Sequence, residues 1–254
     1  MARSGALASE ALRAAKEVAR ELAADGADAV VLMGSWVRGD AYPESDIDVD
    51  AIGRGLRYRL SRRGRFLVAV SWRTSAAWRR AFRDPASVGG AIPGWRGARV
   101  LHDPRGVARA LKEQAARWTW DALGGRADAW VAEEITGYAE EVHKLVGNLA
   151  LRRPSAAAVQ RSILALRMAP LLAVRHRILY ETENRLWDLV AARMGSRWRR
   201  SQVAALGIGG ESLSRSCRAA LALYALTAAD VASLLDRRQR HVVAHACALA
   251  GRPL

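Results

Sequence analysis

Short apolar runs and helical patterns alternate in the first half of the chain. The run Ala29–Met33 is continuously apolar, which is typical of a buried strand, and the mostly apolar Phe66–Trp72 predicts another strand. Residues Ile47–Ile52 alternate apolar and acidic positions, which predicts a half-buried strand with its acids on one face. A helical period covers Ser4–Ala24, and Arg99–Leu101 predicts a further short strand.

The other positions of this half predict connections and one short helix. Residues 53–64 are rich in Arg and Gly and predict a turn or hairpin connection. A helix is expected around Ser75–Phe82, followed by a loop rich in Gly and Pro that extends to Gly97. Beyond the last strand only long Ala, Leu and Arg segments remain, which predict helices. We therefore expect an α/β half to about residue 122 and an all-helical half from about residue 126.

Positive charge dominates the composition. The 254 residues carry a formal net charge of +15, and Lys16, Lys112 and Lys144 are the only lysines, so nearly all of the charge is arginine. A basic surface attracts phosphates, from an NTP to a nucleic acid. Arginines on solvated faces, whose stems cover apolar surface, are the favoured interpretation for most of them. No basic repeat is interleaved with aromatic residues, so nucleic acid is a less favoured partner.

The remaining composition points to no membrane, no secretion and no zinc site. No early apolar stretch resembles a signal peptide, and none is expected to be long enough to cross a bilayer. The two cysteines, Cys217 and Cys247, are far apart and lack metal-ligand spacing, and the five histidines lack a zinc pattern. We expect a cytoplasmic protein without a membrane partner.

A Gly-Ser turn, an arginine and two aspartates lie between and within the first two predicted strands. Gly34 allows a tight turn and a close approach to a ligand, and Ser35 begins a short helix whose hydroxyl and free N–H groups suit phosphate oxygens. Arg38 is three residues further on and can add a charge to a triphosphate. Asp46 and Asp48 are two residues apart on a strand, so both point to one face.

Two carboxylates on one face beside a phosphate cradle form a hard-oxygen site that suits Mg²⁺. Such ions bridge the attacking and leaving oxygens of an in-line displacement at phosphorus. Each part of the pattern is common by itself, but the order and the flanking strands make the combination specific. The sequence GSWVRGD followed by SDID resembles the signature of the polymerase-β-like nucleotidyltransferase superfamily.

The helical half narrows the resemblance to the family of kanamycin nucleotidyltransferases. Residues 132–144 (AEEITGYAEEVHK) and 176–182 (HRILYET) are similar to the corresponding segments of that family, as is the strand-to-helix turn VLHDPRG at 100–106. The resemblance implies an α+β fold, with a small mixed β-sheet nucleotidyltransferase domain, 1–122, that binds NTP and metal. An all-helical bundle domain, 126–254, would follow it.

The same resemblance implies roles for individual residues. Asp46 and Asp48 match the catalytic metal-binding carboxylates, and Gly34, Ser35 and Arg38 match the nucleotide-binding turn. In the helical half, Glu140 matches the general base that acts on the acceptor hydroxyl, and Lys144 matches a lysine that contacts the nucleotide phosphate. Thr182 matches a residue that reaches the active site from a second subunit, which implies a homodimer with shared sites.

The implied reaction is transfer of a nucleoside monophosphate from an NTP, with ATP as the favoured donor, to a hydroxyl of a small acceptor. One or two Mg²⁺ ions are the implied cofactor, and the resemblance favours an aminoglycoside-like acceptor, which would be cationic. Acids of the helical half could bind such an acceptor, namely Glu133, Glu134, Glu140 and Glu141. Transfer onto RNA or protein, and nucleotide binding with impaired catalysis, are the alternatives.

The general base and the third metal-binding carboxylate stay open. Glu140 and Lys144 are four residues apart on a helix, which is equally the pattern of a surface ion pair, and Glu133, Glu134 and Glu141 are rival bases.

The superfamily usually has a third carboxylate where this chain has Ala69. Asp50 shares a face with Asp46 and Asp48, and replaces this carboxylate if it lies opposite Ala69. We slightly favour the other interpretation, that Asp50 is a solvated residue at the end of its strand.

Overall fold

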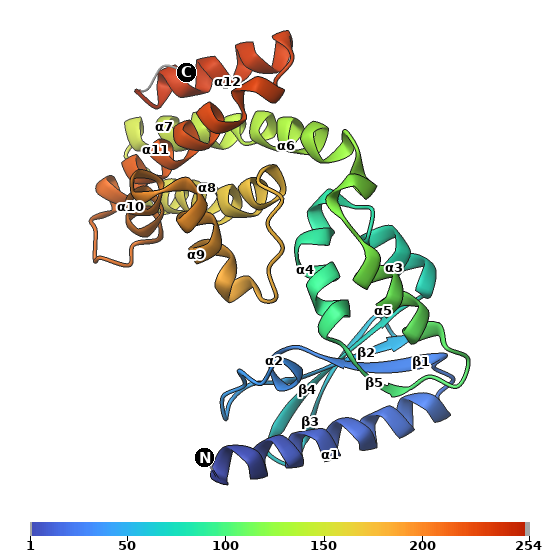
Figure 1. The fold of residues 1–254 in the computed structure, drawn as a ribbon. Coiled ribbons are helices and arrows are strands. Elements are labelled where there is room, and N and C mark those ends of the chain that lie inside the picture. The colour runs from blue at the N-terminus through green and yellow to red at the C-terminus, as the bar shows by residue number, and fades with distance from the viewer. Residues whose placement is uncertain (1, 252–254) are drawn as a thin grey trace. The chain divides into compact units, whose positions relative to one another are not determined.

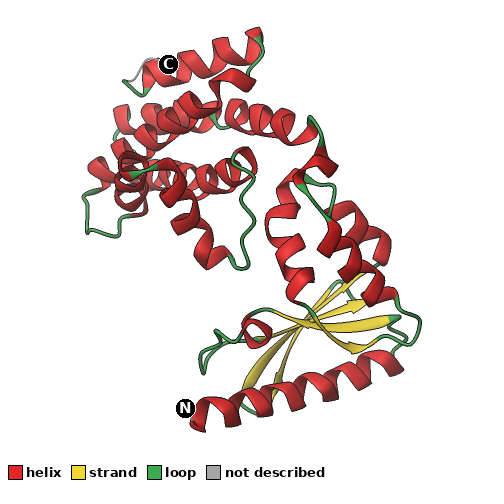
Figure 2. Ribbon diagram, viewed as in Figure 1, coloured by secondary structure: helices red, strands yellow, loops and turns green. Residues whose placement is uncertain are grey.

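The computed structural model describes residues 2–251, which form two compact units joined between Ala122 and Leu123. The first unit contains all five strands of a single sheet, and the second contains helices (Figure 2). The α+β fold class expected from the sequence is confirmed.

The sheet is small and mixed. Its strands, in the spatial order β3-β4-β2-β1-β5, are β3 (Tyr58–Arg63), β4 (Phe66–Arg73), β2 (Ile47–Ile52), β1 (Ala29–Met33) and β5 (Arg99–His102). Strands β2 and β4 are parallel, whereas every other neighbouring pair is antiparallel. The strand that carries the aspartates is therefore central, with a neighbour on each side.

One face of the sheet packs against the long helix α1 (Ala2–Ala24). Buried α1 residues such as Val18 and Leu22 share a core with Val49 of β2 and Val70 of β4. Because side chains alternate between the faces of a strand, Asp48 and Asp50 lie on the opposite face. Figure 1 shows α1 along one side of the sheet and helices α3, α4 and α5 on the other.

Helix α4 (Pro85–Gly97) replaces the loop expected here, so that expectation is wrong. Asp84 caps the helix by accepting a hydrogen bond from the amide of Ala86, and Pro85 occupies the first turn, where its missing N–H costs no helical bond. Three apolar side chains at helical spacing are fully buried, namely Val88, Ile92 and Trp95. Their burial outweighs the low helix propensity of the glycines and of Pro93. Helices α3 (Ser75–Ala81) and α5 (Val107–Arg117) lie in the same unit.

Strand β3 was also missed, because its segment was expected to be a turn or hairpin connection. Its residues alternate in exposure, with Tyr58, Leu60 and Arg62 more exposed than their neighbours. Strand β3 is at the edge of the sheet and pairs with β4 alone, and charged residues are common on edge strands. An arginine-rich strand of this kind has no continuous apolar run to reveal it.

The second unit consists of helices around two apolar ones, α8 and α11. Its helices are α6 (Arg126–Gly137), α7 (Ala139–Ala150), α8 (Pro154–Arg175), α9 (Glu183–Met194), α10 (Ser196–Leu206), α11 (Leu213–Val231) and α12 (Arg237–Leu249). Met168 of α8 and Leu223 of α11 are fully buried, and the buried Tyr224 hydroxyl donates to the carbonyl of Ile135 at 3.1 Å. That hydrogen bond joins α11 to α6.

Two helical segments of this unit, Pro154–Arg175 and Leu213–Leu234, are long and apolar enough to cross a membrane by length and composition. The expectation that no segment of the chain has this length is therefore wrong. Half of the most apolar window of the first and 56% of that of the second are buried inside the structure. Core helices of globular domains pass the same test, so length and composition alone do not assign either helix to a membrane.

Candidate functional site

In the turn after β1, Gly34 lies directly against the side chain of Asp48. Gly34 has φ 75° and ψ −158°, a conformation that is essentially restricted to glycine. A Cβ atom on Gly34 would lie 2.1 Å from Oδ2 of Asp48. Glycine is therefore required twice here, once for the backbone conformation and once for the space that the Asp48 carboxylate occupies. The structure thus brings together two residues that the sequence singled out separately.

Asp48 lies in a strongly perturbed electrostatic environment. Burial and, to a lesser extent, the negative charge of Asp46 raise the pKa of its carboxyl from 3.8 to about 6, against the opposing charge of Arg38. Asp46 comes directly before β2, and Asp48 is the second residue of that strand. A carboxylate whose ionisation is disfavoured by burial and by a neighbouring negative charge gains from a bound cation.

The short helix α2 (Ser35–Arg38) and the following loop support this corner. Arg38 pairs with Asp40 at 3.2 Å and also acts electrostatically on Asp48. The carbonyl of Ser35 accepts the amide of Gly39 at 2.9 Å, which closes the single helical turn. Buried Ser45 accepts the amide of Tyr42 through its hydroxyl at 3.0 Å, so the segment that leads into the aspartates is held by its own hydrogen bonds.

The register of the sheet decides the position of Asp50. In the parallel β2–β4 pair, Asp48 is opposite Ala69 and Asp50 is opposite Ser71. The hypothesis that Asp50 replaces the third carboxylate required it to lie opposite Ala69. Asp50 pairs instead with a residue two positions further along β4, so the hypothesis is wrong. Burial raises the pKa of Asp50 to about 7, against the opposing charge of Arg73, so the residue is also not the solvated strand-end aspartate of the alternative interpretation.

The donor set fits a magnesium ion with few protein ligands. In residues 2–251, no group of three or more His, Cys, Asp or Glu side chains is arranged to hold a metal. Mg²⁺ is commonly held by one or two carboxylates, with waters and substrate phosphates completing its shell. Asp46 and Asp48 supply that number, and a bound cation would favour the ionised form of Asp48, whose pKa is raised chiefly by burial.

Comparison with solved structures finds a likeness of fold. A nucleotidyltransferase-like protein from Exiguobacterium sibiricum 255-15 matches 87% of this chain and 74% of its own, with a TM-score of 0.51 and 10% sequence identity. No family model and no curated protein sequence matches the chain. The chain has a nucleotidyltransferase-like fold. At this identity the likeness concerns the fold alone, so the chemistry has to be argued from the residues of this chain.

Within the helical unit of this nucleotidyltransferase-like fold, the expected base and the expected phosphate ligand bind each other. Lys144 Nζ lies 2.8 Å from Glu140 Oε1 and 3.1 Å from Glu141 Oε1 on helix α7. The hydrogen bond from Lys144 lowers the pKa of Glu140, whose side chain is 71% exposed. This is the geometry of a surface ion pair, which was the alternative interpretation of the spacing.

Glu141 is the more enclosed of the two glutamates. Its side chain is 16% exposed, and its Oε2 atom is buried without a hydrogen-bond partner. Tyr138, one turn earlier, has its pKa raised to about 12 by burial and by the charge and hydrogen bond of Glu134. Two of the rival bases, Glu134 and Glu141, thus lie in one polar cluster with Tyr138.

Thr182 has a local structural function. Its side chain caps helix α9 by accepting the amide of Asn184 at 3.3 Å. The segment before it is fixed by Arg177, which has φ 58° and binds Asp128 of α6 at 2.7 Å.

Sequence reasoning missed the arginines at the far end of β2. It assigned Arg54 and Arg57 to a turn, and no local pattern links them to Arg73, which only the loop and the sheet bring into the same pocket.

Proposed function

We propose that the protein is a Mg²⁺-dependent nucleotidyltransferase that moves a nucleoside monophosphate from an NTP to a hydroxyl of a small acceptor. The observation that carries the proposal is the close approach of Asp48 to Gly34, beside Asp46 and Arg38, within a nucleotidyltransferase-like fold. A Gly-Ser turn and an aspartate pair that are joined in this way put phosphate-binding and metal-binding groups at one corner of the sheet.

The proposed roles follow from the chemistry of each group. Ser35 and Arg38 bind triphosphate oxygens, through a hydroxyl donor and a guanidinium charge. Asp46 and Asp48 hold the magnesium ion, which when bound neutralises charge on the phosphates. The acceptor oxygen forms a bond to the α-phosphorus, the bond from that phosphorus to the bridging oxygen breaks, and pyrophosphate leaves.

The acceptor proton requires a base, for which the helical unit offers Glu140 and Glu141. Both are bound to Lys144, which the resemblance assigns to the nucleotide phosphate. If the Lys144 side chain left the two glutamates to bind a phosphate of the NTP, the pKa of Glu140 would rise from its lowered value. Glu140 would then be a better base. A homodimer in which Thr182 completes the partner's site belongs to the same proposal, and sedimentation velocity tests it.

The deciding experiment is mass spectrometry of acceptors after incubation with the protein, Mg²⁺ and an NTP mixture. The acceptor panel contains aminoglycosides, which the resemblance favours, and neutral and phosphorylated sugars. A mass gain of one nucleoside monophosphate in any acceptor is expected with the wild type and with Asp25→Asn, which alters an exposed carboxylate of the same unit. It should be absent with Asp46→Asn and Asp48→Asn.

Measurements of NTP binding distinguish a defect in catalysis from a defect in nucleotide recognition. We expect Mg²⁺-dependent NTP binding to the wild type and a loss of that binding in Asp48→Asn. Undiminished binding in Asp48→Asn would contradict the proposed site. Binding without transfer to any acceptor would support the alternative of a nucleotide-binding protein in which Ala69 replaces a needed carboxylate.

A further inference from the structure

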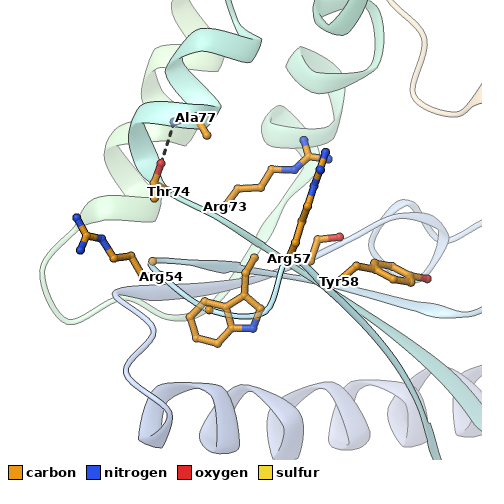
Figure 3. A pocket seen from close by; sticks show the side chains of 10 residues that line it. Arg54, Arg57, Tyr58, Arg73, Thr74 and Ala77 are labelled. Atoms are coloured by element: carbon orange, nitrogen blue, oxygen red, sulfur yellow. Dashed lines mark hydrogen bonds between the residues drawn. The ribbon is translucent and has the colours of Figure 1, made fainter.

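An arginine-lined pocket opens at the end of β2 away from the Gly-Ser turn. It has a volume of about 710 Å³ and is lined by Gly53, Arg54, Gly55, Arg57, Tyr58, Ser71, Trp72, Arg73, Thr74 and Ala77. Figure 3 shows the guanidinium ends of Arg57 and Arg73 close to each other, whereas the Arg54 side chain lies apart from them and points the other way. We define this set of residues as the arginine pocket.

The loop that forms one wall is fixed to the sheet. The amide of Gly53 donates to the carbonyl of Arg73 and the amide of Trp72 donates to the carbonyl of Arg57, both at 3.1 Å. Gly55 lies directly on the Trp72 ring, since a Cβ atom there would be 2.3 Å from the nearest ring atom. The loop is therefore positioned by tertiary contacts at both ends and in its middle.

The pocket has three positive charges and no acidic residue in its lining. Among the ion pairs of the described residues, none includes Arg54, Arg57 or Arg73. The guanidinium of Arg73 is 4.5 Å from the centroid of the Trp78 ring, and this stacking holds it in place. Arg73 does lie near enough to Asp50 for its charge to oppose the raised pKa of that carboxyl. Guanidinium groups that form no direct ion pair in a pocket suit an oxyanion, and phosphate in particular.

The arginine pocket and the aspartate site involve the same face of the sheet, the one opposite α1. Ser71 lines the pocket and is opposite Asp50, two residues beyond the pairing of Asp48 with Ala69. Two residues of a strand correspond to about 7 Å. The proposed triphosphate site begins at Gly34, beside Asp48 near the start of β2, so the pocket at its end is free for another group.

We propose that the arginine pocket binds a phosphate group of the acceptor, so that the acceptor is a phosphorylated small molecule. That the bound molecule is the acceptor rests on the proposed function. That the pocket binds a phosphate group rests on the pocket alone. The Ser71 hydroxyl adds a neutral donor to the lining. A cationic aminoglycoside meets repulsion here, so the proposal departs from the acceptor that the resemblance favours.

Titration calorimetry with ribose 5-phosphate as the probe and ribose as its neutral counterpart tests this. Ribose 5-phosphate should bind the wild type and bind Arg57→Gln and the double variant Arg57→Gln/Arg73→Gln about tenfold or more weakly. Ribose should not bind. Arg65→Gln removes an exposed charge from the far end of the β3–β4 hairpin and should leave the affinity unchanged. The double variant loses the stacking of Arg73 on Trp78 and could unfold for that reason. The single variant Arg57→Gln keeps this contact, so it tests the pocket independently.

The outcomes separate this inference from the proposed function. Equal ribose 5-phosphate binding by the wild type and Arg57→Gln, or none by either, overturns the arginine pocket even if Mg²⁺-dependent NTP binding is intact. Arginine-dependent ribose 5-phosphate binding without NTP binding supports the pocket and contradicts the proposed function. Arginine-dependent binding of a short single-stranded RNA, with none of ribose 5-phosphate, overturns the small acceptor in favour of a nucleic acid.

Discussion

At the scale of single residues, the candidate site depends on the absence of a side chain at Gly34. The position requires a backbone conformation that side chains rarely adopt, and the missing Cβ leaves space for the Asp48 carboxylate. Asp48 and Asp50, in turn, are carboxyls that the fold keeps from ionising easily. Strain and desolvation of this kind are concentrated at sites that bind ligands.

Gly34→Ala should destabilise the protein by about 1–3 kcal/mol and abolish Mg²⁺-dependent NTP binding, because it adds strain and displaces Asp48. Denaturant unfolding and calorimetry measure the two effects. The matched control is Gly26→Ala, since Gly26 also has positive φ (91°) but no atom lies within 4 Å of the place that a Cβ would occupy. It should lose stability and keep NTP binding; equal NTP binding by both variants would show that the collision with Asp48 has no functional effect.

Asp50→Asn should stabilise the protein at pH 8 in the presence of EDTA. The folded state raises the pKa of Asp50 from 3.8 to about 7, so the folded protein binds this proton more tightly than the unfolded chain. Wild-type stability therefore falls as pH rises between these values, by about 2–4 kcal/mol, and the amide has no such loss. Urea unfolding at pH 4 and pH 8 measures the difference, which should shrink towards zero at pH 4. A constant difference at both pH values would contradict the shifted pKa.

At the scale of elements, two segments took a structure that their residue types disfavour. Helix α4 contains four glycines and an internal proline, yet Asp84 and Pro85 begin it correctly and a stripe of three apolar residues anchors it. Strand β3 is mostly polar and is stabilised by pairing with β4. In both cases burial or pairing with distant parts of the chain outweighs local propensity.

Asp84→Ala should lower the free energy of unfolding by about 1 kcal/mol, because it removes the cap of α4. Asp84 accepts the amide of Ala86 and the hydroxyl of Ser87. Asp25→Ala, an exposed carboxylate outside a cap, should change stability by less than about 0.5 kcal/mol. Chemical denaturation measures both. If the two variants were equally stable, the cap would contribute nothing to α4.

At the scale of the whole molecule, ligand binding should raise the free energy of unfolding and therefore the Tm. The sheet unit contains the aspartate site and the arginine pocket, and the helical unit contains the glutamates that the resemblance connects with catalysis. The nucleotidyltransferase-like fold accommodates both kinds of unit in one chain.

Mg²⁺ and NTP together should stabilise the wild type by about 2.7 kcal/mol at a hundred times the dissociation constant. A thermal melt should show the rise in Tm at pH 7.5, its removal by EDTA, and its absence in Asp46→Asn. The rise should weaken below about pH 6, where Asp48 is protonated. A rise in Tm that persists in EDTA would contradict a metal-dependent site.

The sequence by itself determined the elements whose pattern is local. The bounds of β1 and β2 were predicted as the structure has them, because a buried apolar run and a strict alternation are complete within five or six residues. The motif around Gly34 predicted the nucleotidyltransferase-like fold. The spacing of Asp46 and Asp48 predicted a shared strand face, but β2 begins at Ile47, so only Asp48 of the two lies on the strand.

Only the tertiary structure decided what depends on pairing between distant segments. The register of β2 against β4 placed Ala69 opposite Asp48 and left Asp50 beside Ser71, and no local pattern encodes a register. The backbone hydrogen bond from Trp72 to Arg57 gathered Arg57 and Arg73 into one pocket, and tertiary packing buried the apolar stripe of α4. Side chains that are distant in sequence acquire a shared environment only when the sheet forms, and that environment sets their charge and their chemistry.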